Sequence, residues 1–330
     1  MPHAIDRELQ AALDLAPTLP SGPTDALDYR VLRMGYEAAG RASRTPYPDS
    51  LVVTDHRFES AGGRMVSLRL YTPQARQENA PAPGLLFLHG GGWVVGSIET
   101  HDPITAALAV RAGVIVASVD YALAPEHPHP AAIEDVEAAA LWLVEHAGRL
   151  GIDAARIAVG GDSAGGNLAA SACIRARDAG NAQRYAAQLL IYPAVDRNGA
   201  YDSYRRNADA PILSAALMRW FIDQYLGAKV DDRSRDDPSW RDASAFPMFA
   251  ETLTDLPPTF VVTAGHDPLC DEGMAYAARL VRDGVNVTAR HAPDLTHGFV
   301  RYHGASRRAN EELDAACAWL SATLRESKRA

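Results

Sequence analysis

A serine framed by glycines is the part of the sequence best suited to chemistry. Gly161-Asp162-Ser163-Ala164-Gly165 matches G-x-S-x-G, a pattern in which a serine sits on a sharp turn between a strand and a helix. The apolar segment 156–161 precedes the motif and an alanine-rich segment follows it, as that context requires. Small residues at 161 and 165 avoid clashes at such a turn, and Gly166 allows the following helix to pack closely. The pattern therefore predicts nucleophilic attack by the Ser163 hydroxyl.

Two other roles are open to a glycine-rich turn. A nucleotide-binding loop would need G-x-G-x-x-G or G-x-x-x-x-G-K-[ST], and the segment matches neither pattern at the required spacing. A purely structural turn remains an alternative for this motif taken alone, so the neighbours that a nucleophile needs must be found elsewhere in the sequence.

A base and an acid are the first of these neighbours. In a fold with this motif the chain order is serine, acid, histidine. Asp267 closes the apolar segment 259–267, and His297 follows the next predicted strand, so both fall where open parallel sheets place their sites. We expect Asp267 to orient His297 and stabilise its imidazolium form. Alternative bases and acids lie nearby, namely His266, His291, Asp271, Glu272 and Asp294.

Donors to a developing oxyanion are the second need. The sequence His89-Gly90-Gly91-Gly92-Trp93 comes at the end of the apolar segment 85–89. It matches the HGGG-type loop that supplies backbone donors in folds with the G-x-S-x-G motif. We assign the donors to the amides of Gly91, Gly92 and Ala164, and His89 to a structural hydrogen bond within the loop. A flexible glycine hinge is the alternative, and the apolar flanks of the loop disfavour it.

Further residues are candidates for substrate contact: Trp93, Asp162, Tyr192, Leu217, Met218 and Phe221. Three of them belong to segment 212–227, whose apolar residues follow helical spacing, with Ser214 as N-cap and Gly227 after its end. The alternative is that this apolar stripe only packs the helix onto the body of the protein, as most such stripes do.

The elements that would hold these residues alternate between strand and helix. Strands are predicted at 51–58, 65–73, 85–89, 113–120, 156–161, 186–195, 259–267 and 286–292. Helices are predicted at 101–112, 133–151, 164–180, 212–227, 272–283 and 305–325. The first two strands form a hairpin at Gly62-Gly63, and the later alternation predicts a parallel sheet with helices on both faces. The alternation of strands and helices stops between 196 and 245, which predicts an inserted helical excursion. Residues 1–45 are predicted to form helices or an arm and not part of the sheet.

Together these features resemble the bacterial hormone-sensitive lipase family of α/β-hydrolases. The matching pieces are HGGGWVVGS, VDYALAPEHPHPAAIED, GGDSAGGNLAA, AGHDPLCDEG and HGF. The resemblance implies a mostly parallel sheet of eight strands with helices on both faces, built from residues 51–195 and 246–330. It also implies a cap made of residues 1–50 and 196–245. Ala122 departs from the family, which commonly has arginine there, and this puts local packing in question.

The resemblance further implies a serine carboxylesterase that hydrolyses short- to medium-chain esters through an acyl-enzyme, with no metal or cofactor. A second copy of the chain, paired through the last strand or helix, is the implied partner besides a small-molecule ester. Amide or formamide hydrolysis and lipase activity are alternatives on the same three residues. A receptor that has lost catalysis is a further alternative, and the presence of Ser163, Asp267 and His297 disfavours it.

Composition excludes several other classes. The 330 residues are 47% hydrophobic and carry a formal net charge of −9, which disfavours nucleic acid as a partner. The sequence contains no run of 18 uncharged apolar residues, so no membrane span is predicted. The first residues are charged and therefore unlike a secretory signal. We expect a cytoplasmic protein without stable membrane association. The widely separated Cys173, Cys270 and Cys317 predict neither a disulfide framework nor a zinc site.

Overall fold

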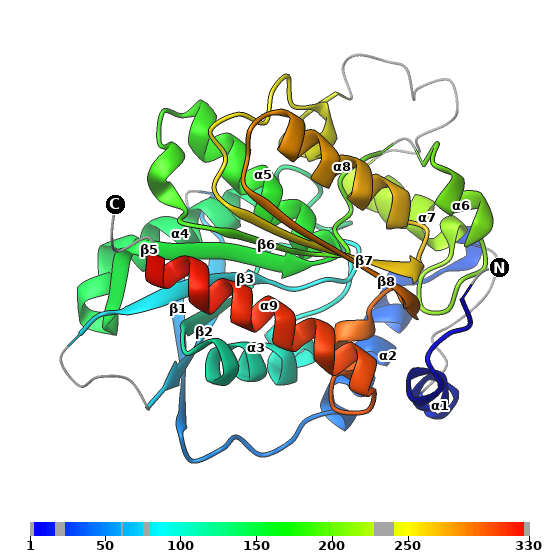
Figure 1. Cartoon of the computed structure of the whole chain (residues 1–330), viewed down its shortest axis with the longest axis horizontal. Coiled ribbons are helices and arrows are strands. Elements are labelled where there is room, and N and C mark those ends of the chain that lie inside the picture. Colours follow the sequence, from blue (N-terminus) through cyan, green and yellow to red (C-terminus); the bar gives the residue numbers. More distant parts are fainter. Residues whose placement is uncertain are drawn as a thin grey trace.

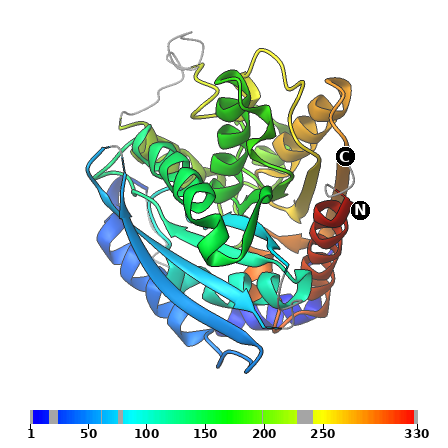
Figure 2. The same cartoon turned by 90° about the vertical axis from the view of Figure 1, so that its left-hand side faces the viewer.

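The computed structural model describes residues 3–16, 24–60, 62–74, 80–197, 199–227 and 241–326. Within these ranges the strands form one eight-stranded sheet in the order β1-β2-β4-β3-β5-β6-β7-β8. Strand β2 is antiparallel to β1 and β4, and all the other pairs are parallel. Figure 2 shows the long β1–β2 hairpin at one edge. The bounds are β1 Leu51–Glu59, β2 Met65–Pro73, β3 Ala82–Leu88, β4 Ile115–Asp120, β5 Ile152–Asp162, β6 Gln188–Ile191, β7 Thr259–His266 and β8 Val287–Thr296.

Helices cover both faces of this sheet, which confirms the predicted α/β-hydrolase architecture (Figure 1). Helices α3 and α9 lie on one face, and α4, α5 and α8 lie on the other. Their bounds are α3 Ile98–Ala112, α4 Ala131–Leu150, α5 Ala164–Asp178, α8 Cys270–Arg282 and α9 Arg307–Glu326. The smaller elements are α1 Arg7–Leu15, α2 Tyr29–Ala42, α6 Asp202–Arg206, α7 Ala215–Leu226 and the 3-10 turn η5 Phe299–Tyr302.

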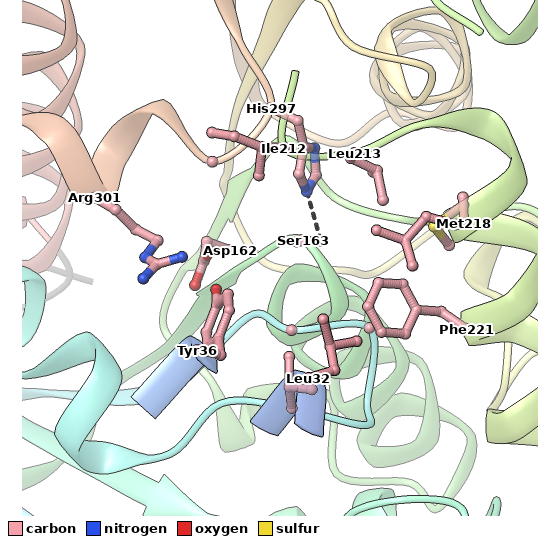
Figure 3. A pocket seen from close by; sticks show the side chains of 15 residues that line it. Leu32, Tyr36, Asp162, Ser163, Ile212, Leu213, Met218, Phe221, His297 and Arg301 are labelled. Atoms are coloured by element: carbon pink, nitrogen blue, oxygen red, sulfur yellow. Dashed lines mark hydrogen bonds between the residues drawn. The ribbon is translucent and has the colours of Figure 1, made fainter. Parts of the chain in front are cut away.

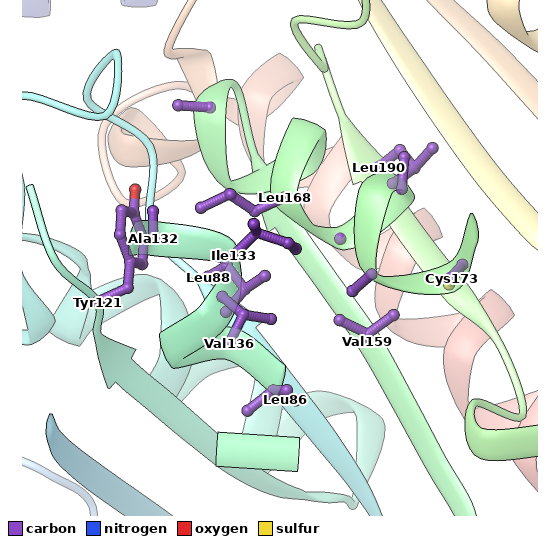
Figure 4. Close-up of a cluster of buried hydrophobic side chains, with 14 of the residues drawn as sticks. Leu86, Leu88, Tyr121, Ala132, Ile133, Val136, Val159, Leu168, Cys173 and Leu190 are labelled. Atoms are coloured by element: carbon purple, nitrogen blue, oxygen red, sulfur yellow. The ribbon is translucent and has the colours of Figure 1, made fainter. Parts of the chain in front are cut away.

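The period of two along each strand divides the core between these faces. In β3, Leu86 and Leu88 pack beneath α4 and α5, while Leu85 and Phe87 point to the face covered by α3 and α9. Figure 4 shows the first cluster, in which Ile133 of α4 meets the strand side chains. Burial of each such side chain contributes about 1.5–3 kcal/mol to folding. The central strands are therefore held rigidly, and the loops at their carboxyl ends have a fixed base.

Among the element boundaries that differ from the predicted ones, three have clear physical reasons. Helix α3 begins earlier because Ser97 and Thr100 form a capping box at its start. Strand β6 ends at Ile191 because the chain turns at Tyr192, whose φ is +36°. Strand β8 runs on to Thr296, paired with His266, and therefore delivers His297 directly at the sheet edge.

The predicted cap segments supply α1 and α2 from residues 1–50, and α6 and α7 from residues 196–245. Helix α7 has the predicted ends, with Ser214 as N-cap and Gly227 in the left-handed conformation after its last turn. Residues 1–2, 17–23, 198 and 228–240 of these segments lie outside the described part of the chain. The division into core and cap stays a prediction.

Two features of composition have structural counterparts. Cys173, Cys270 and Cys317 are buried and none is in a disulfide. No helix in the described ranges combines the length and apolar character that a membrane crossing needs.

A buried ion pair occupies the region of the unusual Ala122. Asp135 of α4 is only 1% exposed, and its carboxylate accepts hydrogen bonds from the guanidinium of Arg64 and from the amide of Ala122. The hydrogen bond to Asp135 raises the pKa of Arg64. Arg64, which lies between β1 and β2, is thus the cation that pairs with the buried carboxylate of Asp135. Position 122, an alanine in this chain, supplies only its backbone amide to that carboxylate.

Arg64→Met will lower the free energy of unfolding by about 3 kcal/mol, because it leaves the Asp135 carboxylate buried without its cation. Urea unfolding at pH 7.5 measures this change. Arg57→Met is the matched control: Arg57 is an exposed arginine on the adjoining strand β1, and its substitution should change stability by less than about 0.5 kcal/mol. Equal effects of the two substitutions would contradict the role given to Arg64.

Candidate active site

Ser163 sits on a strained turn between β5 and α5. Its φ of +56° and ψ of −118° lie in a region that a residue with a side chain rarely adopts. A Cβ on Gly165 would overlap the carbonyl oxygen of Leu88, and one on Gly161 would overlap the same oxygen. A Cβ on Gly166 would come within 2.9 Å of Pro193 Cβ. The glycines are therefore required by close backbone approach, and the turn lifts Ser163 above the end of the sheet.

The side chains of Ser163, His297 and Asp267 form one continuous hydrogen-bonded chain. His297 Nε2 lies 2.9 Å from Ser163 Oγ, and His297 Nδ1 lies 2.7 Å from Asp267 Oδ2. All three side chains are buried or nearly so, Asp267 completely. They reach one place because β5, β7 and β8 are parallel, so their carboxyl ends share one edge of the sheet.

This arrangement fixes the proton positions on His297. The carboxylate of Asp267 can only accept at neutral pH, so Nδ1 carries the proton and Nε2 is free to accept from the Ser163 hydroxyl. Asp267 is itself held: its Oδ1 accepts from the amide of Leu269 at 2.8 Å. The Asn207 side chain donates to the backbone carbonyl of Asp267 at 2.9 Å. Asn207 follows α6, so the 196–245 segment braces the loop that carries the acid.

The side chains of the alternative bases and acids do not join the hydrogen-bonded chain of Asp267, His297 and Ser163. His291 lies within β8 and contacts Thr263 Oγ1. His266 ends β7, and its backbone carbonyl accepts from the amide of His297. The three alternative acids likewise face other groups: Asp294 pairs with Arg308, Asp271 pairs with Arg206, and Glu272 accepts from the amide of Val195.

The glycine loop after β3 faces Ser163. Gly91 and Gly92 have φ values of +126° and +58°, and a Cβ on Gly91 would overlap the carbonyl oxygen of Val95. Within the described residues, the amides of Gly91, Gly92 and Ala164 have no protein hydrogen-bond acceptor. Ala164 is also the first residue of α5, whose N-terminus favours negative charge. The three amides are therefore available to a developing oxyanion beside Ser163.

Asp162 ties this loop to the serine turn. Its carboxylate accepts from the amide of Gly90 at 2.8 Å, lies 3.2 Å from His101 Nε2, and accepts from the Tyr192 hydroxyl at 3.2 Å. Burial favours the neutral acid, but the charge and hydrogen bond of His101 and the Gly90 amide outweigh it, so the pKa of Asp162 is lowered. Asp162 therefore remains ionised and holds the loop and the turn in register.

His89 has the structural position expected for it. Its ring stacks on Tyr121 with centroids 4.2 Å apart, and its Nδ1 donates to the Gly90 carbonyl at 2.9 Å. Burial, with repulsion from His101, lowers the pKa of His89 from 6.5 to about 3. The imidazole is therefore neutral throughout the pH range of an ordinary assay.

This shift predicts a loss of stability on acidification. Below pH 6.5, His89 is protonated in the unfolded chain but stays neutral in the folded protein. The free energy of unfolding therefore falls as the pH drops. The contribution amounts to about 2 kcal/mol between pH 7.5 and pH 5. His89→Asn keeps a donor near the Gly90 carbonyl and removes the titrating group. Urea unfolding of this variant should therefore show a fall in the free energy of unfolding between pH 7.5 and pH 5 that is smaller than the wild-type fall by about 2 kcal/mol. The same loss in the wild type and the variant would contradict the neutral, buried His89.

A cavity of about 50 Å³ opens beside Ser163 (Figure 3). Of the predicted substrate contacts, Asp162, Leu217, Met218 and Phe221 line it, together with Gly91, Gly92 and His297. A Cβ on Gly92 would overlap the Phe221 ring, so α7 rests directly on the glycine loop. The apolar residues of α7 thus face the site as well as packing the helix onto the body.

The structure does not bring Trp93 and Tyr192 to this cavity. Trp93 is completely buried and stacks on Tyr225, with ring centroids 4.2 Å apart. Its backbone has a left-handed φ of +59°, and the ring packs against the α7 helix that carries Tyr225. Tyr192 is buried behind the site, where its ring lies 4.7 Å from the ring of His297 and supports it. Trp93 and Tyr192 therefore support α7 and His297, respectively, and do not line the cavity.

Other lining residues were missed by sequence reasoning: Leu32, Tyr36, Val95, Ile212, Leu213, Gly298 and Arg301. Leu32 and Tyr36 belong to α2, whose amphipathic pattern marks a buried face without indicating what it covers. Arg301 follows the HGF motif by two residues, and that spacing could have indicated a position close to His297.

Comparison with known proteins agrees with this geometry. The family described as alpha/beta hydrolase fold matches residues 85–301. Esterase LipI of Mycobacterium tuberculosis (strain ATCC 25618 / H37Rv) is 41% identical over 281 residues, 85% of each chain. Ethyl acetate hydrolase of Pseudomonas putida is 36% identical over 296 residues, 88% of this chain and 89% of the relative. The structure of a hyperthermophilic esterase from the archaeon Pyrobaculum calidifontis has a TM-score of 0.84 and 36% identity, covering 97% of this chain and 99% of that one.

The sheet, its two helical layers and the serine turn define the class as an α/β-hydrolase. The chain belongs to the hormone-sensitive-lipase-like carboxylesterases of that family, and it is a carboxylic ester hydrolase.

Proposed function

We propose that Ser163, His297 and Asp267 are the catalytic residues of this ester hydrolase and that its substrates are short- to medium-chain carboxylic esters. The single observation that carries the assignment is the hydrogen-bonded chain from Asp267 through His297 to Ser163. It faces three amides that have no acceptor in the part of the protein that the structure describes. Among the described residues, none of the alternative bases and acids considered from the sequence is hydrogen-bonded to Ser163.

Hydrolysis proceeds by two acyl transfers. His297 Nε2 takes the proton of Ser163 as Oγ attacks the ester carbonyl, and the amides of Gly91, Gly92 and Ala164 bind the oxyanion. His297 then protonates the leaving alcohol, which gives the acyl-enzyme. Water, deprotonated by the same imidazole, attacks the acyl carbon and releases the acid. Asp267 stabilises the imidazolium in both halves without taking its proton.

The preference for shorter chains rests on the side chains of α7 that bound the cavity. Leu217, Met218 and Phe221 lie along its apolar side. The relative from Pseudomonas putida is an ethyl acetate hydrolase, which agrees with a small substrate. We also propose that residues 1–50 and 196–245 act as a cap, because α2 and α7 both contribute side chains to the cavity.

Turnover of p-nitrophenyl esters from acetate to palmitate, each at fixed enzyme concentration, tests this substrate class. We expect the highest kcat/KM between acetate and octanoate and a steep fall beyond. A matched p-nitroanilide series distinguishes esterase from amidase activity and should be cleaved far more slowly. A maximum at palmitate would favour a lipase, and comparable anilide cleavage would favour an amide hydrolase; either result would overturn the proposal.

A homodimer and a cytoplasmic location stay predictions from the sequence. Light scattering of the purified protein tests the first, because a chain of 35.4 kDa gives clearly different masses for one and two copies.

A further inference from the structure

The cavity at Ser163 has chemically different sides. Figure 3 shows Arg301, Tyr36 and Asp162 on one side of the Ser163–His297 pair. Leu213, Met218 and Phe221 lie on the other side. An ester bound at Ser163 would therefore place one end against apolar side chains and another near a guanidinium.

Arg301 forms no ion pair with the carboxylates that the structure describes. Within the described residues, no carboxylate lies within ion-pair distance of its guanidinium. The nearest acid in the cavity, Asp162, already accepts from Gly90 and Tyr192 and faces His101. An arginine stays charged at any ordinary pH, and the partly exposed guanidinium of Arg301 lines the cavity. An anionic group on a bound substrate would therefore find a cation within the cavity with which to pair.

The guanidinium of Arg301 is held in place by an aromatic ring. Its guanidinium lies over the Tyr36 ring, with Cζ 4.1 Å from the ring centroid, and Tyr36 is itself buried. The α2 helix that carries Tyr36 is held by Arg33, which donates to the carbonyls of Val94, just after the glycine loop, and of Ala124, after β4. A planar guanidinium held on an aromatic face keeps its edge free for a bidentate contact.

We propose that Arg301 determines substrate specificity by binding a carboxylate on the ester, so that the preferred substrates are half-esters of dicarboxylic acids or O-acylated hydroxy acids whose carboxyl group is free. The proposal rests on the proposed function of the Ser163 site. The apolar side would hold the other substituent of the same molecule. Arg301 is a binding residue here and takes no part in proton transfer.

Matched substrate pairs test this preference, each pair differing only in a carboxylate or a methyl group. Monoethyl succinate with ethyl butanoate, and monoethyl adipate with ethyl hexanoate, place the charge on the acyl side. The pair 4-acetoxybutanoate and butyl acetate places it on the alcohol side. Titration of released acid at pH 8 gives kcat/KM for every substrate, and at this pH the carboxylates are fully ionised.

We expect the wild type to prefer the anionic member of at least one pair. Arg301→Met should lower that ratio by about 10- to 100-fold, the usual worth of a hydrogen bond to a charged group. Arg301→Lys should restore part of it. Arg307→Met is the matched control, because Arg307 is an exposed arginine of α9 that does not line the cavity. It should leave the ratio unchanged.

Failure of this inference is distinguishable from failure of the proposed function. If the wild type hydrolyses the neutral esters but shows no anionic preference in any pair, or if Arg301→Met leaves the ratio unchanged, the inference is wrong and the esterase assignment stands. If no ester is hydrolysed, the proposed function fails first. Should Arg301→Met fold poorly, competitive inhibition of the wild type by glutarate, compared with neutral dimethyl glutaramide, gives the same decision without a variant.

Discussion

Ser163→Ala will lower kcat for p-nitrophenyl butyrate by about 10⁶-fold, because the acyl-enzyme can no longer form. Among the described residues, the Ser163 side chain is hydrogen-bonded only to His297, at 2.9 Å, so its removal should hardly change the fold. Alanine is also no more strained than serine at a φ of +56°. A thermal melt close to that of the wild type, together with loss of turnover, is the expected pair of results.

The buried serine at position 171 provides the matched control for this substitution. It lies on the same helix, α5, and does not line the cavity, so Ser171→Ala should retain turnover. If Ser163→Ala retained more than about a hundredth of the wild-type rate, the nucleophile would have to be another residue.

Asp267→Asn will lower kcat by about 10⁴-fold. An asparagine at this position can present its NH2 group to His297 Nδ1, which favours the tautomer with the proton on Nε2. That tautomer cannot accept the proton of Ser163. The amide also withdraws the negative charge that stabilises the imidazolium, so both halves of the reaction slow down. Stopped-time assays with p-nitrophenyl butyrate between pH 6 and pH 9 measure the loss.

Asp294→Asn is the control for the acid. Asp294 was an alternative on sequence grounds, and in the structure its carboxylate pairs with Arg308, away from His297. This variant should retain wild-type turnover. A larger loss from Asp294→Asn than from Asp267→Asn would contradict the assigned acid.

Much of the site could be predicted from sequence because it depends on backbone geometry. The serine turn requires glycines wherever a Cβ would overlap the Leu88 carbonyl, and those glycines form a recognisable pattern. The acid and the histidine follow successive parallel strands, and parallel strands end at one edge of the sheet. Local patterns of this kind can be recognised in the sequence without knowledge of the tertiary structure.

Contacts made by distant elements could not be predicted in the same way. Tyr36 reaches the cavity only because α2 packs against α3, with Gly40 close to Thr100. Trp93 was expected at the cavity because it follows the glycine loop, but its left-handed backbone directs the ring onto Tyr225. Nothing in the local sequence of either residue specifies the partner, so tertiary packing decided both outcomes.

The substrate side of the site follows from the same packing. The α7 helix rests on the glycine loop through Phe221 and Gly92, and η5 places Arg301 four residues after His297. Helices outside the sheet therefore shape the cavity, while loops at the strand ends hold the reacting groups. Changes in α2, α7 or η5 should alter substrate preference with smaller effects on the hydrogen-bonded chain at Ser163.

Covalent labelling with diethyl p-nitrophenyl phosphate, followed by peptide mass spectrometry, tests the central assignment most directly. The reagent should release one equivalent of p-nitrophenol per chain, abolish ester turnover and leave a diethylphosphoryl group on the peptide that contains Ser163, and Ser163→Ala should not be labelled. An enzyme that hydrolyses esters yet carries the adduct on another residue, or that loses turnover without any adduct, would contradict it.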